Sequence, residues 1–180
     1  DTLGDWSSDV CSSISARFRL TLKSSRSAMK KMTPYYKYKK ERLKSKLSMA
    51  KDTLTLMQGA MKEYANTNSV YLRRSILGYF QDFTEYIIDM CETYLVITDN
   101  YVDKCSGIEL IKRSRIYGFL DDTLSEFLVT LVRLRNRYTH DYYKRDRVEE
   151  DIFKCCFSEM MYLEIFLQIT DSEIHLKFKR

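Results

Sequence analysis

Apolar side chains recur at intervals of three and four residues along most of this sequence. In the segment after Pro34 they are Leu43, Leu47, Ala50, Leu54, Met57, Met61 and Tyr64. This spacing places them on one face of an α-helix and leaves polar residues on the other face. Proline suits the first turn of a helix. The pattern therefore predicts one long amphipathic helix that begins near Pro34 and reaches about Tyr64.

A second helix and a short third one are expected to follow. "NTNS" at residues 66–69 offers several N-cap residues, and the helix after it is expected to run to about Thr98. Its apolar stripe is Ile76, Phe80, Phe83, Ile87, Met90 and Tyr94. The pattern breaks around "DNYVDKCSG", after which a short helix through Ile108 to Tyr117 is expected to end before Gly118.

Two more long helices complete the chain. "DDTLSE" supplies Asp121 or Asp122 as an N-cap, with Glu126 in the first turn. The inward residues of that helix are expected to be Leu124, Phe127, Leu128, Leu131 and Val132. A last helix over about residues 146–170 is expected to bury Ile152, Phe153, Phe157, Met160, Met161, Leu163 and Phe166.

The expected elements form an all-α fold, an up-down bundle of four long helices plus a short one, in a single domain over residues 34–171. Five glycines and one proline leave few signals for strands and turns. No run approaches the ~20 apolar residues of a membrane span. The protein is therefore expected to be soluble. The five cysteines lack metal-ligand spacing and a disulfide pattern, which suits a reducing cytoplasm, and no metal site or cofactor is expected.

Both ends of the chain are expected to lie outside this domain. Residues 1–14 resemble a translated sequencing adapter, with "DWSSDVCSS" as its core, and are excluded from fold reasoning. Residues 15–33 lack clean periodicity and are expected to be a disordered or non-native leader, with Met29 or Met32 as the true start; an ordinary disordered tail is the alternative. Residues 172–180 are expected to fray.

The first turns of the first helix are basic, and the chain carries a net charge of +5. The cations are Lys37, Lys39, Lys40, Arg42, Lys44 and Lys46. They are able to contact RNA, but lysines on an exposed helix need no partner, so a solvated face is the favoured interpretation. The charge permits a polyanionic partner without requiring one.

The stretch "RLRNRYTHDYY" at residues 133–143 interrupts the apolar stripe with polar groups. Arg135 lies four residues after Leu131, and Asn136 lies four after Val132. The helix therefore aims a cation and an amide where its earlier turns place apolar residues. An unpaired charge is costly to bury. Either an acidic partner meets Arg135, or that end of the bundle opens into a cleft or a subunit interface.

His140, one of only two histidines, stands close behind these cations. It lies four residues after Asn136 and three after Arg137, so the three share one helix surface if the helix extends that far. Imidazole exchanges protons near neutral pH, and guanidinium groups bind phosphate. The alternative without a catalytic role is a histidine that is favoured near a helix C-terminus by the helix macrodipole. RNA cleavage normally uses two proton-transfer groups, so a single His140 points to a site built from two chains.

At these residues the sequence resembles the HEPN superfamily, and most closely its HepT-like toxin ribonucleases. Their motif is Arg, four to six residues, then His, often Arg-X4-His-X-Tyr with Asn after the Arg. Arg135, Asn136, His140 and Tyr142 match it, and Arg133 fits the longer spacing. The likeness runs from about residue 40 to 170, with Thr139 where the family more often has an aliphatic residue.

The resemblance implies a homodimeric, metal-independent endoribonuclease, the toxin of a toxin-antitoxin system, with RNA as substrate. Arg135 and His140 would be catalytic, and Asn136 would orient or bind the substrate together with Arg133 and Arg137. A minimal nucleotidyltransferase antitoxin would silence the site by transferring AMP to Tyr142. Two alternatives remain open: a non-catalytic HEPN module that binds a nucleotide or a partner protein, and a plain helical interaction protein in which Arg135 is satisfied within its own chain.

Overall fold

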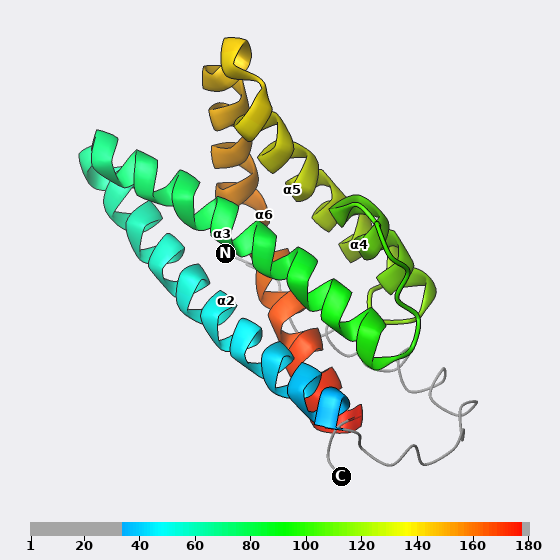
Figure 1. Cartoon of the computed structure of the whole chain (residues 1–180). Coiled ribbons are helices and arrows are strands. Elements are labelled where there is room, and N and C mark those ends of the chain that lie inside the picture. The colour runs from blue at the N-terminus through cyan, green and yellow to red at the C-terminus, as the bar shows by residue number, and fades with distance from the viewer. Residues whose placement is uncertain (1–33, 178–180) are drawn as a thin grey trace, which may run out of the picture. The chain divides into compact units, whose positions relative to one another are not determined.

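The computed structural model describes residues 34–177, with the side chains of residues 34–37, Tyr142 and Lys177 excepted. The expectations for residues 1–33 and for the last three residues lie outside this part. Five α-helices and one short 3-10 turn make up the described chain, which contains no strand. The predicted all-α bundle of four long helices and a short one is therefore confirmed (Figure 1).

Helices α2 (Pro34–Thr67) and α3 (Val70–Ile97) form a long antiparallel hairpin. Their connection is two residues long, and Asn68 there has a φ of 50°, a left-handed conformation that asparagine tolerates. The Asn68 amide donates to the Tyr64 carbonyl at 2.8 Å, which closes α2. Ser69 is the N-cap of α3, although its side chain makes no capping hydrogen bond. Both predicted helices are confirmed within a few residues.

Helices α4 (Gly107–Ile116) and α5 (Asp122–His140) begin at well-formed caps. Ser106 and Glu109 make a reciprocal capping box, and the backbone amide of Ser106 lowers the pKa of the Glu109 carboxyl. Asp121 caps α5 by accepting from the Leu124 amide at 2.7 Å, and Asp122, rather than Glu126, is the acid of the first turn. The Ser106 cap fixes the start of α4, and the Asp121 cap fixes the start of α5.

Helix α6 (Arg145–Lys177) extends beyond its predicted end near residue 170. Ile174 is buried against the core, so the residues expected to fray from 172 onwards continue the helix as far as Lys177. Glu159 interrupts the helix with a φ of −127°, but the buried stripe keeps its spacing across this kink, since Cys156 and Leu163 are both buried and seven residues apart. Phe157 and Met161, predicted to point inward, are instead 50% and 59% exposed. Ile152, Phe153, Leu163 and Phe166 are buried as expected.

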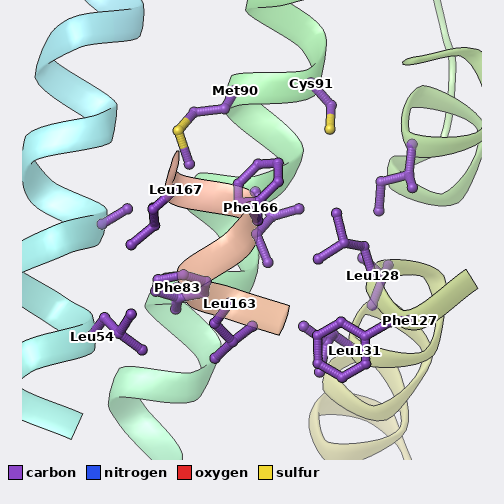
Figure 2. Close-up of a cluster of buried hydrophobic side chains, with 14 of the residues drawn as sticks. Leu54, Phe83, Met90, Cys91, Phe127, Leu128, Leu131, Leu163, Phe166 and Leu167 are labelled. Carbon is purple, nitrogen blue, oxygen red and sulfur yellow. The ribbon is translucent and has the colours of Figure 1, made fainter. Parts of the chain in front are cut away.

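The core collects apolar side chains from all the long helices (Figure 2). Leu54 of α2, Phe83 of α3, Leu128 of α5 and Phe166 of α6 are among those that face one another. Close packing of this kind supplies most of the stability of a helical domain. None of the helices in the described part is long and apolar enough to cross a bilayer. The packing of α5 against the other long helices fixes the position of its C-terminal turns.

Candidate functional site

The last two turns of α5 carry the motif. The helix reaches His140, so the condition under which Asn136, Arg137 and His140 are neighbours on one helix is met. The Asp141 amide donates to the Arg137 carbonyl at 2.7 Å and ends the helix. A 3-10 turn, Tyr142–Lys144, then leads into α6. The side chain of Tyr142 lies outside the described part.

Arg135 points from α5 towards α3, where Glu85 forms an ion pair with it. The Arg135 side chain is only 29% exposed, and its guanidinium also donates to the Asn136 side-chain oxygen at 3.2 Å. Its Nε is buried and finds no hydrogen-bond partner among the described residues. Of the two outcomes predicted for a polar residue on the apolar stripe, the structure thus has the acidic partner. That partner leaves part of the guanidinium's hydrogen-bonding capacity unused.

Arg137 connects α5 to the start of α6. Its guanidinium lies 3.4 Å from the Asp151 carboxylate on α6 and 3.8 Å from the Asp141 carboxylate at the end of its own helix. All three side chains are substantially exposed. Exposed pairs of this kind contribute little to stability and exchange readily with other anions. Arg137 is therefore available to a phosphate that replaces these carboxylates.

A second network joins the first turns of α6 to α5 and α3. Arg145 donates to the Tyr138 hydroxyl at 2.9 Å and stacks on the Tyr138 ring at 4.8 Å. Glu149 accepts from Arg73 of α3 at 3.0 Å and lies 3.5 Å from Arg145. Glu149 is largely buried, so this cluster ties together the three helices that surround the motif.

His140 is exposed at the end of α5, and Arg133 is exposed seven residues before it. Residues three, four and seven apart share one face of a helix, so Arg133, Arg137 and His140 line a single basic edge. Arg135, five residues before His140, stands about 140° further round the helix, since each residue turns by about 100°. A single chain therefore brings Arg133, Arg137 and His140 to one face but turns Arg135 towards Glu85.

The acidic residues of the site were not identified from the sequence. Glu85 lies between the buried residues Phe83 and Ile87, at the edge of the stripe that faces the core. An acid at such an edge is the signal that would have indicated a buried cation on a neighbouring helix. Asp151 and Glu149 sit on exposed or intermediate positions of α6 with no comparable signal.

Within residues 34–177 no group of three or more His, Cys, Asp or Glu side chains is arranged to hold a metal ion. The site instead offers an imidazole and several guanidinium groups. Such a set binds phosphate and exchanges protons near neutral pH. Its chemistry suits a phosphodiester or a nucleotide.

No family model and no curated protein matches this chain. Several solved structures do. The chain is similar to a tri-AMPylated HEPN toxin of Shewanella oneidensis in complex with its MNT antitoxin, at 17% identity and a TM-score of 0.65, over 73% of this chain and 97% of the other.

Two further structures have the same architecture. One is a toxin-antitoxin complex with AMP-PNP, at 16% identity and a TM-score of 0.62, over 71% of this chain and 96% of the other. The other is a mutant of the toxin-antitoxin pair MntA–HpeT, at 17% identity and a TM-score of 0.60, over 73% and 98%. The likeness covers nearly the whole of each of these chains. The described bundle therefore has the fold of the HEPN toxins.

Proposed function

We propose that this protein is a metal-independent endoribonuclease and acts in the cytoplasm as the toxin of a toxin-antitoxin system. The observation that carries the proposal is the exposed basic edge of Arg133, Arg137 and His140 at the end of α5. The helical bundle that carries this edge has a fold similar to that of a HEPN toxin. RNA is the polyanion whose cleavage such an edge supports without a metal ion.

The reaction begins when the 2'-hydroxyl oxygen of the RNA attacks the adjacent phosphorus. His140 accepts the 2'-hydroxyl proton, and Arg135 and its neighbours stabilise the charge on the phosphorane-like transition state. The bond from phosphorus to the 5'-oxygen breaks, and the leaving oxygen takes up a proton. The products are a 2',3'-cyclic phosphate and a 5'-hydroxyl end. Asn136 orients the phosphate, and Arg133 and Arg137 hold the flanking backbone.

We propose that the second proton-transfer group comes from His140 of a second copy in a homodimer. In such a dimer, Arg135 of one chain acts together with His140 of the other chain. The two residues therefore do not have to lie on the same face of one helix. Mixing wild-type protein with an excess of His140→Ala tests this. A composite site predicts that wild-type cleavage falls as mixed dimers form; activity that follows only the amount of wild-type protein would contradict it.

The cleavage itself is tested with wild type and His140→Ala, expressed in a host without an antitoxin and assayed as purified proteins on RNA in the presence of a chelator. The variant is expected to be non-toxic and to lose at least ~10²-fold in cleavage rate, the usual contribution of positioned proton transfer. His140 is exposed, so circular dichroism is expected to match in the two proteins. Equal cleavage by both would refute the proposal.

Regulation by a minimal nucleotidyltransferase antitoxin is the second part of the proposal. One similar toxin is tri-AMPylated and in complex with an MNT antitoxin. Here the Tyr142 hydroxyl would attack the α-phosphorus of ATP, form a phosphodiester to AMP and release pyrophosphate. An anionic adenylate two residues from His140 would repel RNA. Mass spectrometry after incubation with the transferase and ATP checks this, with Tyr142→Phe as control; no adenylate on Tyr142 would contradict it.

A non-catalytic module that binds a nucleotide or a partner protein is the alternative function. The ion pair of Arg135 with Glu85 instead favours the plain helical interaction protein, for which an arginine satisfied within its own chain is expected. The unsatisfied Nε of Arg135 argues for a further anionic ligand in either case. Binding of RNA or nucleotide without any cleavage by wild type would favour the module.

A further inference from the structure

A groove of about 390 Å³ lies between the first half of α2 and the last turns of α6. It is lined by Lys40, Lys44, Leu47, Ser48, Lys51, Asp171, Ile174 and His175. Leu47 and Ile174 are buried and form an apolar floor, while the charged residues form the walls. From Arg145 to residue 172 the chain advances roughly 40 Å along α6 at 1.5 Å per residue. The groove is therefore remote from the motif within one chain.

The cations form a row along α2. Lys40, Lys44, Ser48 and Lys51 follow one another at intervals of four, four and three residues, which places them on one face of the helix. Lys40 and Lys44 are about 6 Å apart along the helix axis, from four residues at 1.5 Å each. The lining holds three lysines and one aspartate, a formal charge of +2 with His175 neutral.

Two of the lysines, Lys44 and Lys51, pair with exposed carboxylates. Lys44 pairs with Glu41 at 3.1 Å, on the exposed surface, and Lys51 pairs with Asp171 at 2.9 Å. Both pairs have side chains at least 40% exposed. Such pairs are weak in water, and a phosphate is able to displace them.

His175 lines the groove and contacts Asp171 through one ring nitrogen. Its Nδ1 lies 2.8 Å from the backbone carbonyl oxygen of Asp171 and 3.3 Å from the Asp171 carboxylate. Both are acceptors, so Nδ1 carries a proton and donates. Nε2 remains for a ligand, and it donates to an anion whenever the ring is protonated.

We propose that this groove binds the phosphodiester backbone of single-stranded RNA. A basic groove that follows the backbone is how proteins hold single strands without reading their sequence. The cations line a concave surface over an apolar floor, which fits a chain lying in the groove better than a flat anionic bilayer. The proposal rests on the proposed function, because it takes RNA as the polyanion; it adds a second contact region, remote from the motif.

The test measures binding of a fluorescent 2'-O-methyl oligouridylate, which lacks the hydroxyl needed for cleavage, at several salt concentrations. Each phosphate contact contributes about 0.7 to the slope of log affinity against log salt for single strands. Replacing Lys40 and Lys44 together by Gln is expected to reduce that slope by about 1.4, twice the contribution of one contact. Lys62→Gln is the matched control, since Lys62 is exposed on the other half of α2. Its slope is expected to equal that of wild type.

Asp171→Asn provides a change of opposite sign. It removes the only carboxylate among the described residues that line the groove, and it is expected to tighten RNA binding. A slope for the double lysine variant equal to that of Lys62→Gln would overturn the proposal. So would loss of binding to phosphatidylserine vesicles with RNA binding unchanged, which would assign the groove to membranes.

Failure of the groove and failure of the proposed function give different results. The double lysine variant is judged by its binding of the uncleavable RNA alone, whereas His140→Ala is judged by its cleavage of unmodified RNA, which it is expected to lose. If His140→Ala cleaves normally, the ribonuclease proposal fails, but the groove is still judged by the uncleavable RNA.

Discussion

Glu85 on α3 forms an ion pair with Arg135 on α5, and this pair holds the motif arginine against the bundle rather than in solvent. The pair joins two helices at the point where the apolar stripe of α5 becomes polar. A partly buried arginine that lost its carboxylate would be left with an uncompensated charge. The position of Arg135 thus depends on a residue 50 positions earlier in the chain.

A double-mutant cycle with Glu85→Gln and Arg135→Gln measures the strength of this pair. Because the side chains touch, we expect a coupling of about 1 kcal/mol in the free energy of unfolding, within the range for neighbouring residues. Urea denaturation of the four proteins provides the values. Effects that add to within about 0.3 kcal/mol would show that the pair contributes nothing to stability.

Arg133 and Arg135 are expected to respond differently to the same change. Arg135→Gln removes the partner of Glu85 and is expected to lower stability by about 1 kcal/mol and cleavage by roughly 10²-fold. Arg133→Gln alters an exposed residue, so stability is expected to stay within about 0.5 kcal/mol while RNA affinity falls.

The control for this comparison is Arg74→Gln, which changes an exposed arginine on α3. It is expected to leave both cleavage and stability at the wild-type level. The interpretation of the motif would be wrong if Arg133→Gln and Arg135→Gln both cleaved RNA like Arg74→Gln.

The sequence predicted the helices because each has a regular stripe and recognisable caps, of which Asp121 is an example. It mispredicted Phe157 and Met161 because steps of four residues from Phe153 lead off the buried stripe, which runs through Cys156 and Leu163. It left an acidic partner for Arg135 as one of two outcomes and did not identify Glu85. Periodicity assigns a residue to a face of its helix, whereas ion pairs depend on how two helices are set against each other.

The last turns of α6 are expected to contribute to stability, contrary to the frayed tail that the sequence suggested. Ile174 is 5% exposed, whereas Leu176, two residues later, is 65% exposed. Ile174→Ala is expected to cost about 2–4 kcal/mol, the usual range for a buried aliphatic residue. Leu176→Ala is the matched control and is expected to change stability by less than about 0.5 kcal/mol. Equal denaturation midpoints for the two variants would mean that this end of α6 does not pack on the core.

Cys91 is expected to make stability depend on alkaline pH. Burial raises the pKa of its thiol from 9.0 to about 12. Below 9.0 the thiol is neutral in both the folded and the unfolded chain. Above that value the unfolded thiol ionises while the folded one stays protonated, so the unfolded state binds fewer protons and stability falls as pH rises towards 12.

The measurement compares wild type with Cys91→Ala by urea denaturation from about pH 7 to about pH 10.5, a range in which other groups contribute equally to both proteins. The variant lacks the titrating thiol, so any stability advantage of wild type at neutral pH is expected to shrink above 9.0. An advantage that stayed constant over this range would mean that Cys91 ionises as easily in the folded protein as in the unfolded chain. Water would then reach the Cys91 thiol more easily than its full burial in the core implies (Figure 2).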